Sequence, residues 1–129
     1  MVIDSSALVA ILLNEPEREP FLAAIQKAST RLVSTATMIE TAVVLLMRRG
    51  DKAIDTLAAL QSTLDLQPVA LTENHATLAV EAYRIYGKGR HPAGLNLGDC
   101  FAYALAKSTG LPLLCKGSDF PQTDIVLHA

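Results

Sequence analysis

Four acidic residues in this chain lie where a carboxylate could do chemistry. Asp4 interrupts an apolar opening, VIDSSALVA, and Asp99 opens the alanine-rich stretch GDCFAYALAK. Glu40 lies early in TATMIETAVVLL, and Asp119 follows an apolar run in LLCKGSDF. Carboxylates that pack together repel one another, and their pKa values rise unless a cation lies between them. If the four converge in the fold, the chemistry they predict is the binding of a hard divalent cation.

A cation with oxygen ligands fits the rest of the sequence better than a softer metal. The histidines (His75, His91 and His128) are scattered, and Cys100 and Cys115 form no C-x-x-C pair. Neither pattern has the ligand spacing of a zinc site, and both cysteines are expected to be buried, reduced thiols. Mg²⁺ or Mn²⁺ held by carboxylates can bind a phosphodiester, lower the pKa of an attacking water and stabilise the leaving oxygen. The predicted reaction class is therefore metal-assisted phosphodiester hydrolysis.

Each acid taken singly also has a structural explanation. Asp4 could cap a helix, and Asp119 could make an Asx turn. Thr37–Glu40 (TMIE) has the form of a capping box, and Asn96–Asp99 (NLGD) is a close relative of one. The set is harder to explain in this way, because the helix that Asp99 opens is almost wholly apolar. An acid at the start of such a helix is costly without a partner.

Polar residues near these acids have candidate supporting roles. Ser6 and Ser118 could hold a metal-bound water or the substrate, although cap and turn hydroxyls explain them as well. A modest basic rim could face a phosphate backbone; its candidates are Lys88, Arg90, His91 and Lys116. For the first three of these, an ordinary solvated loop is an equally good explanation.

The spacing of apolar residues predicts short strands that alternate with helices. Strands are expected at Met1–Ile3, Arg31–Ser34, Gln67–Leu71, Leu113–Cys115 and Asp124–Leu127. Helices are expected at Ser5–Leu13, Pro16–Ser29, Thr37–Arg49, Asp51–Leu64, from a Thr72 cap to about Tyr86, and at Leu97–Ser108. This alternation predicts an α/β fold with a parallel sheet. Ligands bind outside the carboxyl ends of such strands, so the four acids are expected at that edge.

Two of these helices have apolar residues at helical spacing that are expected to face the core. In Thr37–Arg49 they are Ile39, Ala42, Val43, Leu46 and Met47. In Asp51–Leu64 they are Ile54, Leu57, Ala58 and Leu64.

Composition limits the class of protein. The 129 residues suit a single domain spanning 1–129, half of them are apolar, and no apolar run reaches the roughly 18 residues of a membrane helix. The net charge of −2 and the 5% of aromatic residues argue against a duplex-binding face and against a base-stacking platform. The start lacks the features of a signal peptide. The expectation is a cytoplasmic protein with no membrane contact.

The order of four motifs resembles the PIN-domain ribonucleases, in particular toxins of the VapC type from toxin–antitoxin systems. The motifs are VIDSSALVAIL, STATMIETAVVL, LNLGDCFAYALAK and LLCKGSDFPQTDI. The resemblance implies a three-layer α/β/α sandwich around a small parallel sheet. It also implies that Asp4, Glu40, Asp99 and Asp119 bind Mg²⁺ or Mn²⁺ and cut RNA, with Asp119 acting through water. Relatives form homodimers, and a cognate antitoxin blocks their site.

Two other functions stay open at this point. A haloacid-dehalogenase-like phosphatase also has an aspartate after its first strand, but it needs a second one two residues on, where this chain has Ser6. A non-catalytic interaction module could use the same scaffold. Asp124, the spare acid near the end, is interpreted as a surface or strand-start residue.

Overall fold

A small parallel sheet lies at the centre of the molecule. The computed structural model describes residues 1–129. Its strands are β1 (Val2–Ile3), β2 (Leu32–Ser34), β3 (Gln67–Val69) and β4 (Leu113–Leu114), in the order β3-β2-β1-β4. The helices are α1 (Ser5–Leu12), α2 (Arg18–Lys27), α3 (Thr35–Arg49), α4 (Lys52–Thr63), α5 (Glu73–Tyr86) and α6 (Leu97–Thr109), followed by a 3₁₀ turn, η1 (Phe120–Gln122). All strand pairs are parallel, as the alternation of strands and helices predicts.

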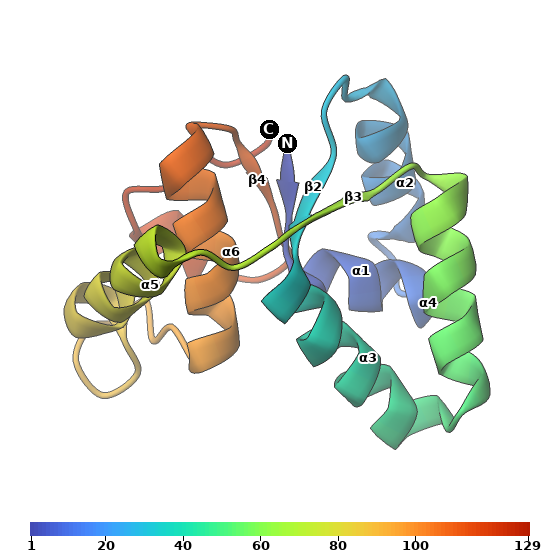
Figure 1. Ribbon diagram of the computed structural model, residues 1–129, viewed down its shortest axis with the longest axis horizontal. Coiled ribbons are helices and arrows are strands. Elements are labelled where there is room, and N and C mark those ends of the chain that lie inside the picture. Colours follow the sequence, from blue (N-terminus) through green and yellow to red (C-terminus); the bar gives the residue numbers. More distant parts are fainter.

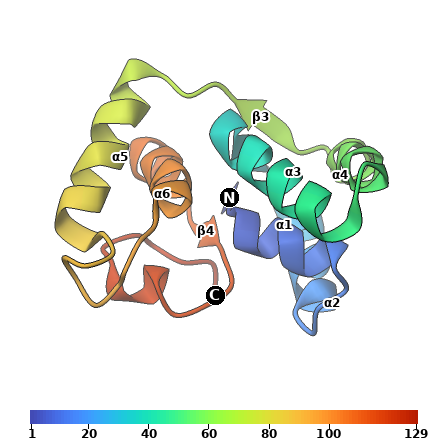
Figure 2. The ribbon, with the colours of Figure 1, turned by 90° about the horizontal axis from the view of Figure 1, so that it is seen from below.

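The helices cover both faces of the sheet, which gives the expected α/β/α sandwich. Helices α5 and α6 lie on one side, and α1 to α4 lie on the other (Figures 1 and 2). Successive strand residues point to opposite faces. Val2 and Leu113 therefore enter the core beneath α5 and α6, whereas Ile3 and Leu114 enter the core beneath α1 and α2. Two residues per strand suffice to join both cores at β1 and β4.

The predicted last strand, Asp124–Leu127, is wrong. The 3₁₀ turn η1 occupies the chain up to Gln122, and the segment after it makes only an isolated bridge between Leu113 and Leu127. Two backbone hydrogen bonds hold it to β4: Leu113 N donates to Val126 O at 2.9 Å, and His128 N donates to Leu113 O at 2.9 Å. The apolar pattern was right about proximity to the sheet, but the segment pairs with β4 at a single position and does not form a strand.

The predicted inward face of α3 is also wrong. Thr37, Thr41 and Leu45 are the buried residues of this helix. The five expected apolar residues face outward or are half-buried, with Met47 82% and Ile39 66% exposed. Burial of the threonine hydroxyl is tolerated at Thr41, because its Oγ1 donates to the carbonyl of Thr37 at 2.8 Å. The contacts of α3 with its neighbours, and not its own apolar stripe, set its orientation.

The interface of α3 with α4 explains part of the orientation of α3. Leu45 packs with Ala53 and Leu57 in a small core of its own. In α4 the prediction is right for Leu57 and Leu64, which are buried, and wrong for Ile54 and Ala58, which are exposed.

Membrane insertion has no candidate helix in this structure. No helix combines the length and the apolar character that crossing a bilayer requires.

Candidate active site

Asp4 leaves β1 at the carboxyl end of the sheet and is almost completely buried, with 1% of its surface exposed. It caps α1: Oδ2 accepts from Ser6 N at 3.0 Å and from Ser6 Oγ at 2.6 Å. The other oxygen, Oδ1, is buried and has no hydrogen-bond partner. Burial raises the pKa of Asp4 to about 7, against the lowering effect of the Ser6 hydrogen bonds. One oxygen serves the helix, and the other is left for a ligand.

Asp99 lies in the first turn of α6 and forms the capping box that the NLGD sequence predicts. Its backbone N donates to Asn96 Oδ1 at 2.9 Å, and its Oδ2 accepts from Asn96 N at 3.0 Å. Burial raises the pKa of Asp99 to about 6, and the charges of Asp119 and Glu40 raise it further. The helix behind it is largely buried, as expected. As at Asp4, one carboxylate oxygen is committed to the backbone.

Glu40 comes from α3, but not from its first turn. The helix begins at Thr35 with Ser34 as its N-cap, so the predicted capping box at Thr37–Glu40 is wrong. Ser34 ends β2 and its Oγ accepts from Ala36 N at 3.3 Å, which leaves Thr37 inside the helix. The Glu40 carboxylate lies against Gly98 of α6, and its Oε1 is buried without a hydrogen-bond partner.

Asp119 completes the set from the loop after β4. It is exposed, precedes η1, and its side chain makes no capping hydrogen bond, so the predicted Asx turn is not what fixes it. Its charge nevertheless acts on Asp99. Ser118 beside it is exposed, and the contact it makes is through its backbone carbonyl, which accepts from Gln122 Nε2 at 3.1 Å.

The site is therefore a patch of uncompensated negative charge. Asp99 and Glu40 both raise the pKa of Asp4, and Asp119 and Glu40 both raise that of Asp99. None of the chain's ion pairs involves these four acids. Buried, like-charged carboxylates with unpartnered oxygens fit a hard divalent cation.

The acids do not form a finished metal cage. No three acidic, histidine or cysteine side chains are gathered closely enough to complete a metal site by themselves. Mg²⁺ retains several waters and takes only a few carboxylates together with substrate oxygens. The arrangement therefore suits an ion whose coordination water and substrate would complete.

A hydrogen-bond network connects Asp4 to the loop that carries Asp119. Ser6 Oγ donates to Asp4 and accepts from Lys116 N at 2.9 Å. The Lys116 ammonium, predicted for the basic rim, instead pairs with Glu15 and with Glu17, the latter at 3.1 Å. Its charge is directed toward the α1–α2 connection and away from a bound anion.

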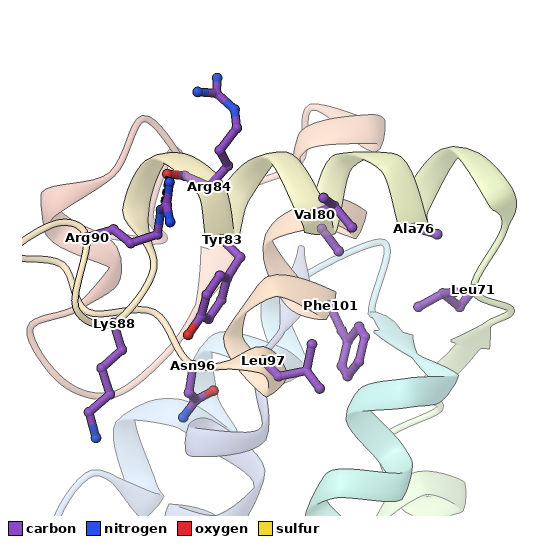
Figure 3. A pocket seen from close by; sticks show the side chains of 11 residues that line it. Leu71, Ala76, Val80, Tyr83, Arg84, Lys88, Arg90, Asn96, Leu97 and Phe101 are labelled. Carbon is purple, nitrogen blue, oxygen red and sulfur yellow. Dashed lines mark hydrogen bonds between the residues drawn. The ribbon is translucent and has the colours of Figure 1, made fainter.

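A groove of about 700 Å³ lies between α5 and α6. Its floor is apolar, and Lys88, Arg90 and Asn96 gather at one end of it (Figure 3). Arg90 Nε donates to the carbonyl of Arg84 at 3.0 Å, and neither Lys88 nor Arg90 has a carboxylate partner. Asn96 joins this groove to the site, because it caps the helix that carries Asp99.

The thiols and imidazoles lie outside this chemistry. Both cysteines are free, and burial raises the pKa of Cys100 to about 11 and that of Cys115 to about 12. His75 completes the capping box of α5, and His91 Nδ1 accepts from Ala93 N at 3.0 Å. Those contacts are structural.

Comparison with known proteins agrees with this fold and shows the family. The PIN domain family model matches residues 1–126. The chain is 51% identical over 129 residues to ribonuclease VapC30 of Mycobacterium tuberculosis, covering 100% of this chain and 98% of that one. It is 49% identical over 125 residues to ribonuclease VapC of Mycolicibacterium smegmatis, covering 97% of each.

Solved structures show the same fold at much lower identity. The M. tuberculosis toxin VapC20, described as cleaving the sarcin–ricin loop, superposes with a TM-score of 0.77 at 19% identity, over 97% of this chain and 95% of that one. A toxin–antitoxin complex from Klebsiella pneumoniae gives 0.73 at 19% identity, over 98% and 95%. The class defined by fold and family model is the PIN domain.

Within that class, the chain belongs to the VapC ribonucleases. It is a PIN-domain endoribonuclease of the toxin type, which confirms the fold, the family and the enzyme class that the sequence motifs predicted. The haloacid-dehalogenase-like alternative is wrong.

Sequence reasoning overlooked one residue of the site, Gly98. Glycine is a poor helix former, so its presence in the first turn of an otherwise alanine-rich helix was the available signal. It directly precedes Asp99 and lies against Glu40.

Proposed function

We propose that this ribonuclease hydrolyses RNA phosphodiester bonds with Mg²⁺ or Mn²⁺ held by Asp4, Glu40, Asp99 and Asp119. The observation that carries the proposal is the carboxylate of Asp4, buried to 1% exposure with an unpartnered oxygen and two further acids acting on it. A bound divalent ion would supply an activated water and stabilise charge on the phosphate.

Each of the four acids has a different place in the proposed metal site. Asp4 and Asp99 each keep one oxygen on a helix N-terminus, so their free oxygens are held at fixed positions. Glu40 adds a third carboxylate from the neighbouring helix. Asp119 is exposed and suits a role through water. Ser6 keeps Asp4 oriented and ties it to the loop of Asp119.

Lys88 and Arg90 are the basic residues that best support a place for the RNA backbone. Both are exposed, lack carboxylate partners and share a groove with Asn96. Phosphate contacts of this kind are weakened by salt. Lys116 and Ser118 are less well supported, since the ammonium of Lys116 is paired with glutamates.

The proposed partners are an antitoxin and a second copy of the chain. Solved neighbours include a toxin–antitoxin complex, which supports an antitoxin. A dimer is supported by exposed apolar side chains on three helices: Ile39 and Met47 of α3, Val80 of α5 and Leu97 of α6, each at least 66% exposed. Exposed apolar clusters of this kind mark protein contacts. A two-fold axis would place Ile39 and Met47 of each copy against the α5–α6 groove of the other.

Cleavage of total RNA tests the proposed chemistry. Wild-type protein with Mg²⁺ or Mn²⁺ is expected to cut RNA, and EDTA or Asp99→Asn is expected to lower the rate at least 100-fold, because both remove a ligand–metal contact. Denaturing gels measure the loss, and circular dichroism checks that Asp99→Asn is folded. Cleavage that survives both EDTA and the substitution would contradict a metal site and leave the acids as structural caps.

A further inference from the structure

The carboxylate of Glu40 occupies the space that a side chain at Gly98 would fill. Gly98 is the second residue of α6 and is buried. A β-carbon at this position would lie 1.6 Å from Glu40 Oε2 and 2.3 Å from Glu40 Cδ. Both distances are far below van der Waals contact. Any other residue at position 98 therefore forces the Glu40 side chain to leave its present place.

The backbone itself does not require glycine at this position. Gly98 is not among the glycines of positive φ, which are Gly50, Gly89, Gly94, Gly110 and Gly117. It lies inside a regular helix, where glycine is among the least favourable residues and alanine the most favourable. The space that glycine leaves, and not its conformational freedom, is what the fold uses here.

No hydrogen bond holds Glu40 in that space. Its Oε1 is buried without a partner, and its carboxylate takes part in no ion pair. Gly98 belongs to the first turn of α6, so the Glu40 carboxylate lies at a helix N-terminus, which favours negative charge. Asp99 follows in the same turn and feels the charge of Glu40.

We propose that Gly98 is a positioning residue of the metal site: it gives the Glu40 carboxylate a place against α6, beside Asp99. The inference rests on the proposed metal-dependent function. A methyl group at position 98 would turn Glu40 toward solvent, because α3 leaves it partly exposed, and the ion would lose one of its ligands. Gly98 acts through Glu40 and touches neither RNA nor metal.

A double-mutant cycle on Mn²⁺ binding tests this role. Four proteins are compared by isothermal calorimetry and Mn²⁺ electron paramagnetic resonance, without RNA: wild type, Gly98→Ala, Glu40→Ala and the double variant. Gly98→Ala is expected to weaken Mn²⁺ binding about tenfold or more, as Glu40→Ala does. The double variant should bind no more weakly than Glu40→Ala alone, since the methyl group has no carboxylate left to displace.

Thermal unfolding without metal gives a second readout. In the Glu40→Ala background, Gly98→Ala is expected to raise the melting temperature, because alanine favours the helix. In the wild-type background the same substitution should lower it or leave it unchanged. If Gly98→Ala alone fails to fold, recovery of folding in the double variant supports the proposal, and failure of both overturns it.

Other results separate this inference from the proposed function. A wild type that binds Mn²⁺ and a Gly98→Ala variant that binds it equally well would overturn the role of Gly98 alone. Additive losses in the double variant would do the same. A wild type that binds no Mn²⁺ would overturn the proposed function, and this inference with it.

Discussion

Asp4 shows how one side chain can serve folding and chemistry together. Its Oδ2 caps α1 through Ser6, while Oδ1 has no partner. In the metal-free protein this arrangement is costly, because an ionised carboxylate is buried beside two other acids. The cap explains why the residue suits the end of β1, and the unpartnered oxygen explains why a neutral cap would not replace its function.

The raised pKa of Asp4 predicts how stability depends on pH. The pKa of Asp4 is about 7 in the folded protein and 3.8 for an unperturbed carboxyl, so the native state binds more protons than the unfolded state between these limits. Stability of the metal-free protein should therefore fall as pH rises from about 4 to about 7, by on the order of a few kcal/mol. Urea unfolding in EDTA from pH 5 to pH 8 measures this slope.

Asp4→Asn is the matched variant for that measurement, because asparagine has nearly the same shape as aspartate and has no ionisable carboxyl group. We expect a flatter pH profile and a higher unfolding free energy at pH 8, together with loss of RNA cleavage. Asp99 has a pKa of about 6, so part of the slope below pH 6 should remain. A profile of Asp4→Asn that is as steep as that of the wild type would contradict burial of the ionised acid as the cause.

At the scale of elements, the C-terminal segment is held by side chains more than by strand pairing. Asp124 accepts from Tyr103 Oη at 2.7 Å and from Lys107 Nζ at 2.6 Å, both on α6. Of the two readings of Asp124, the surface residue is confirmed and the strand start is wrong. The segment therefore helps to fix the helix that carries Asp99.

Asp124→Ala is expected to destabilise the fold and leave the chemistry intact. It leaves the hydroxyl of Tyr103, a residue only 5% exposed, without its partner. Such a loss costs about 1–3 kcal/mol. Lys107→Ala removes only a half-exposed ion pair and should cost less than Asp124→Ala. Urea unfolding ranks the two, and equal stability of Asp124→Ala and wild type would show that the contact is not stabilising.

At the scale of the whole molecule, the apolar residues left outside are as informative as those inside. Helix α3 buries threonines at Thr37 and Thr41 and leaves Ile39 and Met47 in solvent. Burial of Leu45 against α4 accompanies this orientation, and the apolar side chains left exposed support the proposed dimer.

Met47→Glu should abolish the proposed dimer without unfolding the protomer. Met47 is 82% exposed, so a charge there meets only water in a single copy but would be desolvated between two. Val126→Glu, at a residue 68% exposed on the C-terminal segment, is the control. Light scattering after gel filtration should give a dimer for wild type and Val126→Glu and a monomer for Met47→Glu. A monomeric wild type, or a dimeric Met47→Glu, would contradict this interface.

Local signals in the sequence were sufficient for most of the helices and strands, and they suggested the four acids that we propose as the site. Caps such as Thr72 and Asn96 can be recognised in the sequence, because their side chains accept a hydrogen bond from the backbone N–H only three residues later. The helix start before Glu40 was misplaced because several hydroxyls in STAT could serve as the cap. The last strand failed for a different reason: the apolar pattern predicts that the segment lies against the sheet, but not whether it pairs with β4 as a strand or at a single position.

The sequence by itself determined the family and the enzyme class, and it was enough to propose the chemistry, since the four acids and the lack of soft-metal ligands can be read along the chain. Only the tertiary structure decided which face of α3 is buried, that Lys116 pairs with Glu15 and Glu17, and that Gly98 makes room for Glu40. The physical reason is range. Caps and periodicity depend on neighbours within a few residues, whereas ion pairing, helix orientation and close approach depend on residues brought together from distant parts of the chain.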